Sequence, residues 1–233
     1  MSKPKIKIDI ISDVNCPWCY VGDTRLKKAI SAANGRYDFE ISFKPFELDP
    51  TLPPEGLDRG EYFTKKFGAQ AAPQIAAMNQ RLQDAGAEDG LRFNFEEMKT
   101  VNNTFNAHRL IWLAGEYGVQ EQVAHALFYS YFTEAKNMNE VEVLTQIGVT
   151  NGIPAERLNG FFQGEEGKNE VSSLEQWAYS AGITGVPAFI FNDQYLVSGA
   201  QPAETFSQVF AQLAPSLEPI NLTGDSCDLN GNC

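Results

Sequence analysis

Alternation of apolar and polar residues predicts the first elements of the chain. Three isoleucines alternate with Lys and Asp over residues 5–12, which predicts a strand with one buried face. From Leu26 to Ala33 apolar residues recur at helical spacing, so a helix should open at Cys16 and stop at Asn34-Gly35. Residues 39–43 alternate again. The first third therefore reads strand, helix, strand, with parallel pairing of the two strands.

The apolar period is helical throughout from Asp58 to Ala181. Asp58 with Glu61 resembles a capping box, and Pro73 is placed to open a second helix. Strand patterns return only after Gly182, and a last amphipathic helix follows them. The short strands and this helix are expected at 188–191, 195–198 and around 206–213.

This order predicts an α/β fold with a βαβ…ββα core and a large all-helical insertion. The core should comprise residues 1–58 and 182–215, and the helical insertion domain residues 59–181. Residues 216–233, rich in Pro, Asn, Gly and Asp, lack periodicity and are expected to form a C-terminal tail.

Charge and hydropathy exclude several classes of partner. The chain has 18 Lys and Arg against 30 Asp and Glu, a net charge of −12, which would repel the phosphates of a nucleic acid. No apolar run approaches the roughly 20 residues of a membrane span. Lysines and Asp9 interrupt the stretch that a signal peptide would need to keep apolar. A cytoplasmic chain without nucleic-acid or membrane partners is expected, and the sequence specifies no oligomeric state.

Cys16-Pro17-Trp18-Cys19 lies between the first strand and the first helix, a context in which Cys-x-x-Cys is typical of a redox site. Free N–H groups and the positive end of the helix dipole at a helix N-terminus favour a thiolate at Cys16. Cys16 should attack a substrate sulfur, and Cys19, one turn on, should resolve the mixed disulfide.

Half of a zinc site is the structural alternative for this cysteine pair. Zinc would need two further ligands, which Cys227 and Cys233 could supply. Their five-residue gap lies outside the usual two to four residues between ligands. No metal is therefore expected.

Cys227 and Cys233 form a second dithiol in a turn-forming setting that contains Asn230-Gly231. A disulfide that closes so short a loop should be easily reduced. Two interpretations stay open, a relay of oxidising equivalents to Cys16 and Cys19 or a clip without redox function. The relay predicts that a chain cut after Pro215 turns over more slowly.

Asp13, His108 and the pair Asn102 and Asn103 are auxiliary candidates. Asp13, three residues before Cys16, could carry the proton of Cys19 if it is buried, or could equally be a cap or a solvated carboxylate. For the others, a helix N-cap at Asn103 and a half-buried, hydrogen-bonded histidine are the structural alternatives.

The strand-CPWC-helix opening, the helical insertion and the later segment Gly185-Val186-Pro187-Ala188-Phe189 resemble the DsbA family of the thioredoxin superfamily. Three further motifs resemble its cytosolic FrnE-like branch. They are Phe46-Glu47-Leu48-Asp49-Pro50, Asn103-Thr104-x-x-Ala107-His108-Arg109 and Ser198-Gly199-Ala200-Gln201. The resemblance covers about residues 5–214, and it implies a thioredoxin-like core.

The resemblance also implies a cis-proline at Pro187 beside the active-site disulfide. The backbone of Val186 would then face outward and pair with an extended substrate segment. Trp18, Tyr20 and Phe46 are candidates for an apolar rim, although packing is the structural alternative for all three. Strongly oxidising periplasmic DsbA proteins carry a histidine where this chain has Trp18, so a milder oxidant or a general dithiol exchanger is expected.

A thiol-disulfide oxidoreductase acting on protein or small-molecule thiols and disulfides is the leading hypothesis. Such an enzyme needs no cofactor beyond its own redox-active disulfide. Glutathione is the candidate co-substrate. One alternative is a glutathione-dependent isomerase or transferase of the kappa, or 2-hydroxychromene-2-carboxylate isomerase, type, whose reacting position is usually a serine. Another is a zinc-holding, redox-sensing chaperone, which predicts about one bound zinc per chain.

Overall fold

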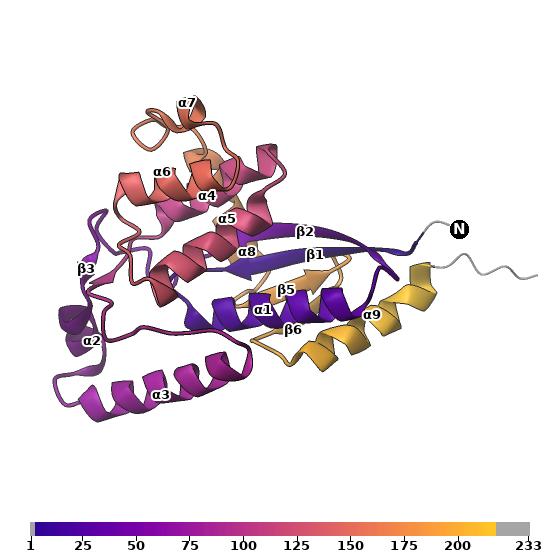
Figure 1. The fold of residues 1–233 in the computed structure, drawn as a ribbon, viewed down its shortest axis with the longest axis horizontal. Coiled ribbons are helices and arrows are strands. Elements are labelled where there is room, and N and C mark those ends of the chain that lie inside the picture. Colours follow the sequence, from indigo (N-terminus) through magenta and orange to yellow (C-terminus); the bar gives the residue numbers. More distant parts are fainter. Residues whose placement is uncertain (1–2, 218–233) are drawn as a thin grey trace, which may run out of the picture.

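A mixed four-stranded sheet lies at the centre of the molecule (Figure 1). The computed structural model describes residues 3–217 of the 233. The strand order is β2-β1-β5-β6, with β1 parallel to β2 and the other neighbours antiparallel. The predicted parallel pair and both short strands are confirmed. The strands are β1 (Lys5–Ser12), β2 (Asp38–Pro45), β5 (Ala188–Phe191) and β6 (Tyr195–Ser198).

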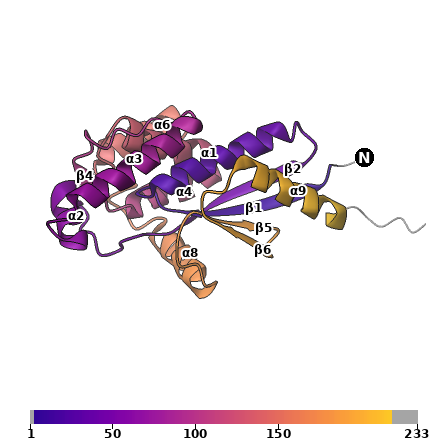
Figure 2. The same cartoon turned by 90° about the horizontal axis from the view of Figure 1, so that it is seen from below.

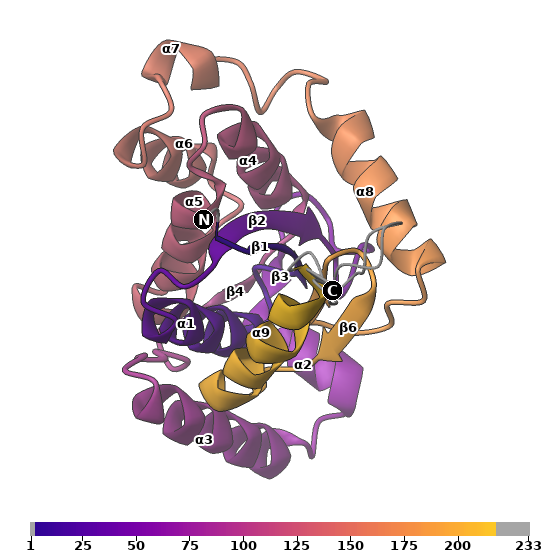
Figure 3. The ribbon, with the colours of Figure 1, turned by 90° about the vertical axis from the view of Figure 1, so that its right-hand side faces the viewer.

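Helices α1 (Pro17–Ala32) and α9 (Ala203–Leu217) pack side by side against the sheet (Figure 3). The ring of Phe206 lies 4.8 Å from that of Phe189 in β5, which joins α9 to the sheet. α1 approaches β5 so closely that a Cβ at Gly22 would lie 3.1 Å from side-chain atoms of both Pro187 and Phe189. This close approach brings the N-terminus of α1 beside the loop that precedes β5.

The segment between β2 and β5 contributes most of the helices, and α4, α5 and α8 pack against β2 (Figure 1). Figure 2 shows α8 apart from α1 and α3. The helices of this segment are α2 (Arg59–Phe67), α3 (Ala72–Glu88), α4 (Phe105–Glu116), α5 (Gln120–Phe128), the π-helix η1 (Tyr129–Thr133), α6 (Val141–Thr150), α7 (Ala155–Leu158) and α8 (Lys168–Ser180).

The expectation of helix throughout Asp58–Ala181 is wrong at two places. β3 (Leu57–Asp58) and β4 (Thr100–Val101) form a two-stranded antiparallel ladder. Each strand has only two residues, too few for an alternating pattern to be recognised. The backbone N–H of Arg59 donates to the carbonyl of Lys99, which extends the contact. The ladder fixes the start of α2 against the loop that leads into α4.

The predicted starts of α2 and α3 are confirmed. Asp58 is the N-cap of α2, and its Oδ1 accepts the N–H of Glu61 at 2.9 Å. Pro73 lies in the first turn of α3, where its missing N–H leaves no helical hydrogen bond unmade. These two helices stand beside the N-terminus of α1 and shape the site described below.

Arg109 of α4 holds the segment that follows α7. Its side chain is completely buried, and its guanidinium donates to the carbonyls of Phe161, Phe162, Gly164 and Glu166. Burial lowers the pKa of this guanidinium, and the carbonyl oxygens take the place of water as acceptors. Arg109 is therefore a structural residue that connects α4 to the turn before α8.

The predicted second dithiol, Cys227 and Cys233, lies outside the described residues. Between residues 3 and 217, no helix is both long and apolar enough to cross a membrane.

Candidate active site

Cys16 occupies the N-cap position of α1, at the end of the loop that follows β1. Its side chain caps no backbone N–H, so the sulfur lies at the positive end of the helix without an internal hydrogen bond to that end. Pro17 follows in the first turn, and the backbone N–H of Cys16 donates to the carbonyl of Asp13 at 3.0 Å. Both Cys16 and Cys19 are buried free thiols, with 5% and 2% of their surface exposed.

The loop before β5 faces Cys16 from the other side. The Val186–Pro187 peptide bond is cis, and the Cys16 thiol donates to the carbonyl of Val186 over 3.6 Å between sulfur and oxygen. Pro187 is buried and Val186 is half-buried. Among residues 3–217, no acceptor lies within hydrogen-bond distance of the N–H of Val186.

The three rim candidates lie in different surroundings. Trp18 is half-buried beside Cys16. Tyr20 is only 2% exposed and stacks on Phe128 at 5.6 Å, so it belongs to the core and not to a rim. Phe46 is also buried, at 5% exposed, and its ring packs 5.1 Å from that of Tyr179. Phe46 therefore offers little surface to a substrate, because its packing against Tyr179 covers the ring.

Cys19 is the more strongly shielded thiol. Burial raises its pKa well above the ordinary range, and contact with Cys16 and the negative charge of Asp13 add to this effect. Asp13 itself is completely buried. Its Oδ1 accepts the N–H of Asn15 at 3.0 Å and its Oδ2 the N–H of Leu48 at 2.7 Å. The Asp13 carboxylate is thus fixed in a buried position from which its charge acts on the Cys19 thiol.

His108 extends this buried group. Its Nε2 lies 3.8 Å from Asp13 Oδ1, an ion-pair distance too long for a direct hydrogen bond. Burial alone lowers the pKa of His108, but the carboxylates of Asp13, Glu175 and Glu47 outweigh it, so the pKa is raised. The histidine is 3% exposed, more deeply buried than the half-buried position expected from the sequence.

Two glutamates complete what we call the acid–histidine cluster, defined as Asp13, Glu47, His108 and Glu175. Glu47 is 7% exposed, and burial together with repulsion from Glu175 raises its pKa to about 7. Burial raises the pKa of Glu175 as well. One carboxyl oxygen of each glutamate, and Nε2 of His108, are buried without a hydrogen-bond partner among the described residues. With these raised pKa values, Glu47 and His108 can hold protons near neutral pH.

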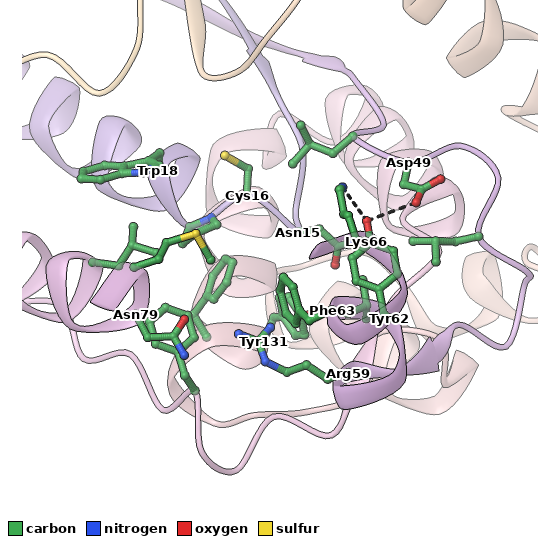
Figure 4. Close-up of a pocket in the computed structure, with 18 residues that line it drawn as sticks. Asn15, Cys16, Trp18, Asp49, Arg59, Tyr62, Phe63, Lys66, Asn79 and Tyr131 are labelled. Atoms are coloured by element: carbon green, nitrogen blue, oxygen red, sulfur yellow. Dashed lines mark hydrogen bonds between the residues drawn. The ribbon is translucent and has the colours of Figure 1, made fainter. Parts of the chain in front are cut away.

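A cavity of about 250 Å³ opens beside Cys16 (Figure 4). It is bounded by the start of α1, by α2, by α3 and by η1. Figure 4 shows Cys16 and Trp18 on one side and Arg59 on another. Its lining residues are mostly apolar and include Leu48, Leu52, Phe63, Met78, Leu82, Phe95, Val101, Tyr131 and Phe132.

Residues 7–211 match the DSBA-like thioredoxin domain family. The chain belongs to this family. A crystal structure of a probable DsbA oxidoreductase from Streptomyces coelicolor has a TM-score of 0.84 and 32% identity, covering 98% of each chain. The chain is thus a DsbA-like, thioredoxin-fold protein of an oxidoreductase family, with the core and the helical segment expected from its sequence.

Two more distant structures share the fold. The cytosolic disulfide reductase DsbM from Pseudomonas aeruginosa, solved with GSH, is 17% identical with a TM-score of 0.62, covering 89% of this chain and 98% of DsbM. A 2-hydroxychromene-2-carboxylate isomerase is 13% identical with a TM-score of 0.70, covering 90% and 97% of the two chains. At such identities the likeness concerns the fold.

The asparagine pair of this DsbA-like chain holds loops near the site. The Asn15 side chain donates to the carbonyl of Asn102 at 2.6 Å, which ties the active-site loop to the segment before α4. Asn103 Oδ1 accepts the N–H of Phe105, although the N-cap position itself is Thr104.

Within the described part of the chain, no group of three or more His, Cys, Asp or Glu residues is arranged to hold a metal ion.

Sequence reasoning missed Glu47, Glu175 and Arg59. A glutamate between Phe46 and Leu48, directly after a strand, was a weak indication of a buried carboxyl. Glu175 and Arg59 offered none, because their environment arises from segments that are distant in sequence.

Proposed function

We propose that this DsbA-like protein is a cytoplasmic dithiol oxidoreductase that exchanges disulfides with protein or small-molecule thiols. The observation that supports this most directly is the asymmetry of the two thiols. Cys16 lies at a helix N-terminus beside a cavity, whereas Cys19 is buried with a raised pKa next to the acid–histidine cluster. A nucleophile and a resolving thiol need this difference.

The proposed reaction has two steps. The Cys16 thiolate attacks one sulfur of a substrate disulfide, and the substrate's other sulfur leaves as a thiolate. Cys19 then gives up its proton and attacks Cys16 Sγ, which releases the second substrate thiol and leaves the Cys16–Cys19 disulfide. One substrate disulfide is reduced to two thiols while the protein dithiol is oxidised, and the reverse sequence oxidises a substrate dithiol.

Asp13 is the proposed acceptor of the Cys19 proton. It is a buried carboxylate whose charge acts on Cys19, and its Oδ1 lies 3.8 Å from Nε2 of His108. A positioned acceptor matters because the raised pKa of Cys19 leaves little thiolate at neutral pH. His108, Glu47 and Glu175 would then share the proton until it reaches solvent.

The backbone of Val186 is the proposed docking edge for extended protein substrates. Its N–H donates to no acceptor among residues 3–217, and its carbonyl accepts the Cys16 thiol. A short substrate strand can pair with such an edge while its cysteine reaches Cys16. Trp18 cannot supply the positive charge of a histidine, so a reduction potential less oxidising than that of periplasmic DsbA proteins is expected. A potential as oxidising as theirs would contradict this part of the proposal.

Turnover of a peptide disulfide with glutathione as the reductant tests the proposal, and the GSH-bound DsbM structure supports that choice of reductant. Wild type should catalyse reduction, and Cys16→Ser should lose at least about 1,000-fold, because no other group replaces the nucleophile. Isomerisation of 2-hydroxychromene-2-carboxylate that survives serine at both cysteines would instead favour the glutathione-dependent isomerase.

A further inference from the structure

The cavity beside Cys16 contains a cation without a countercharge. No carboxylate among the described residues lies within 4.0 Å of the guanidinium of Arg59. The guanidinium stacks over Phe63 at 4.5 Å and over Phe95 at 5.5 Å from the ring centroids. Burial lowers its pKa, and Tyr131 compensates only in part. A half-buried cation held by aromatic faces is a strong donor for an incoming anion.

The other charges of the cavity are already paired with one another. Lys66 Nζ donates to the hydroxyl of Tyr62 at 2.8 Å, and that hydroxyl donates to Asp49 Oδ2 at 3.1 Å (Figure 4). Thr51 donates to the other oxygen of Asp49. These hydrogen bonds lower the pKa of Asp49, so it stays ionised and balances Lys66. Arg59 is left as the uncompensated charge of the cavity.

Shape and apolar lining define the remainder of the ligand. A cavity of about 250 Å³ accommodates a small organic group but not a folded protein surface. Leu82, Phe95 and Phe132 are buried at its wall and favour an apolar or aromatic body. Because Cys16 and Arg59 line the same cavity, a single small ligand can place sulfur at one and an anion at the other.

We propose that this cavity is a recognition site for low-molecular-weight disulfides that carry a carboxylate on an apolar or aromatic body, with Arg59 binding the carboxylate and Cys16 attacking the sulfur. The inference rests on the proposed dithiol function and specifies its small-molecule substrate class. Cys16 forms a bond to the body-bearing sulfur as the substrate S–S bond breaks, and Cys19 then displaces that thiol. The two thiols released carry the electrons that the protein dithiol loses.

A matched pair of aromatic disulfides tests the site. The probes are 5,5′-dithiobis(2-nitrobenzoate), which carries carboxylates, and 2,2′-dithiodipyridine, which is uncharged at neutral pH. The reduced full-length chain with Cys227→Ser and Cys233→Ser leaves Cys16 and Cys19 as its only thiols. Arg59→Gln should slow the reaction with the carboxylate disulfide about tenfold and change the neutral one less than twofold.

Lys65→Gln is the control for long-range charge, because Lys65 is an exposed cation of the same helix that is not among the residues lining the cavity. It should leave both rates within about twofold at 0.1 M salt. Equal slowing of both disulfides by Arg59→Gln would overturn the inference, since Arg59 would then act on Cys16 and not on the substrate. If wild type reduces neither disulfide, the dithiol function itself fails.

Inhibition of the wild-type protein provides a second test that needs no variant. Biphenyl-4-carboxylate should compete with 2,2′-dithiodipyridine at least about tenfold more tightly than biphenyl-4-carboxamide, because only the carboxylate can pair with Arg59. Equal inhibition by the acid and the amide would overturn the assignment of Arg59 as the anion-binding residue.

Discussion

The two sides of the active-site dithiol differ in what they contain. On the side of Cys16 lies an apolar cavity in which Arg59 is the uncompensated charge. On the side of Cys19 lies the acid–histidine cluster, where His108 lines a cavity of only about 20 Å³. One side is suited to binding a substrate and the other to moving a proton. A helix that places two thiols one turn apart lets each meet a different environment.

Substitution of Asp13 tests most strongly whether this residue accepts the proton of Cys19. Asp13→Asn preserves the shape of the side chain but cannot accept a proton, and its single amide oxygen can accept only one of the two N–H groups, of Asn15 and Leu48, that the carboxylate accepts. The resolving step by Cys19 should slow about 10- to 100-fold near pH 7. The attack by Cys16 should change less than threefold. Stopped-flow detection of the first and second thiol released separates the two steps.

Asp9→Asn is the matched control, because Asp9 is a buried carboxylate in the middle of β1, the strand that directly precedes Asp13, and it lies near Lys7 and Lys44. It should leave the resolving step within about threefold. An unchanged resolving rate in Asp13→Asn, or equal slowing of both steps, would show that Asp13 does not carry the proton.

The same comparison explains what the sequence could predict. The strands at 5–12, 188–191 and 195–198 and the start of α1 were predictable because their periodicity and cap residues are local. Cys16 and Cys19 follow from one motif in one context. The cavity and the cluster depend on contacts between distant segments, such as Arg59 with Phe95 or Glu47 with Glu175. Such contacts have no local pattern, so both glutamates and Arg59 were missed.

The raised pKa of Glu47 predicts how the stability of the folded protein depends on pH. Its pKa of about 7 in the folded protein exceeds the ordinary 4.5, so the folded state holds an extra proton between these values. The contribution of protonated Glu47 to the free energy of unfolding is fully present below pH 4.5 and is lost as the pH rises through 7. Glu47→Gln should therefore raise the free energy of unfolding relative to wild type by about 1–3 kcal/mol at pH 8, and by much less at pH 4.5.

Urea unfolding at the two pH values measures this difference. The exposed Glu55→Gln is the control and should show a difference from wild type that does not depend on pH. A Glu47→Gln variant whose advantage is the same at both pH values would contradict a buried carboxyl that titrates near neutrality.

Substitution of Lys66 should have the smallest effect on the reaction with a carboxylate disulfide. Its ammonium is engaged with Tyr62 and, through it, with Asp49, so it should contribute little to a ligand's carboxylate. Lys66→Met should slow the reaction with 5,5′-dithiobis(2-nitrobenzoate) less than about threefold. Stopped-flow absorbance in the Cys227→Ser, Cys233→Ser background measures the rate. An effect as large as that of Arg59→Gln would mean that the two cations share the site.

The central claim is that the two cysteines have separate roles, and trapping tests it most directly. With Cys227 and Cys233 replaced by serine, Cys19→Ser should accumulate a mixed disulfide on Cys16 when it meets a substrate disulfide, and intact mass spectrometry would detect it. The reciprocal variant Cys16→Ser should remain largely unmodified, because Cys19 is buried with a raised pKa. Equal modification of both variants, or no adduct on Cys16, would contradict the account.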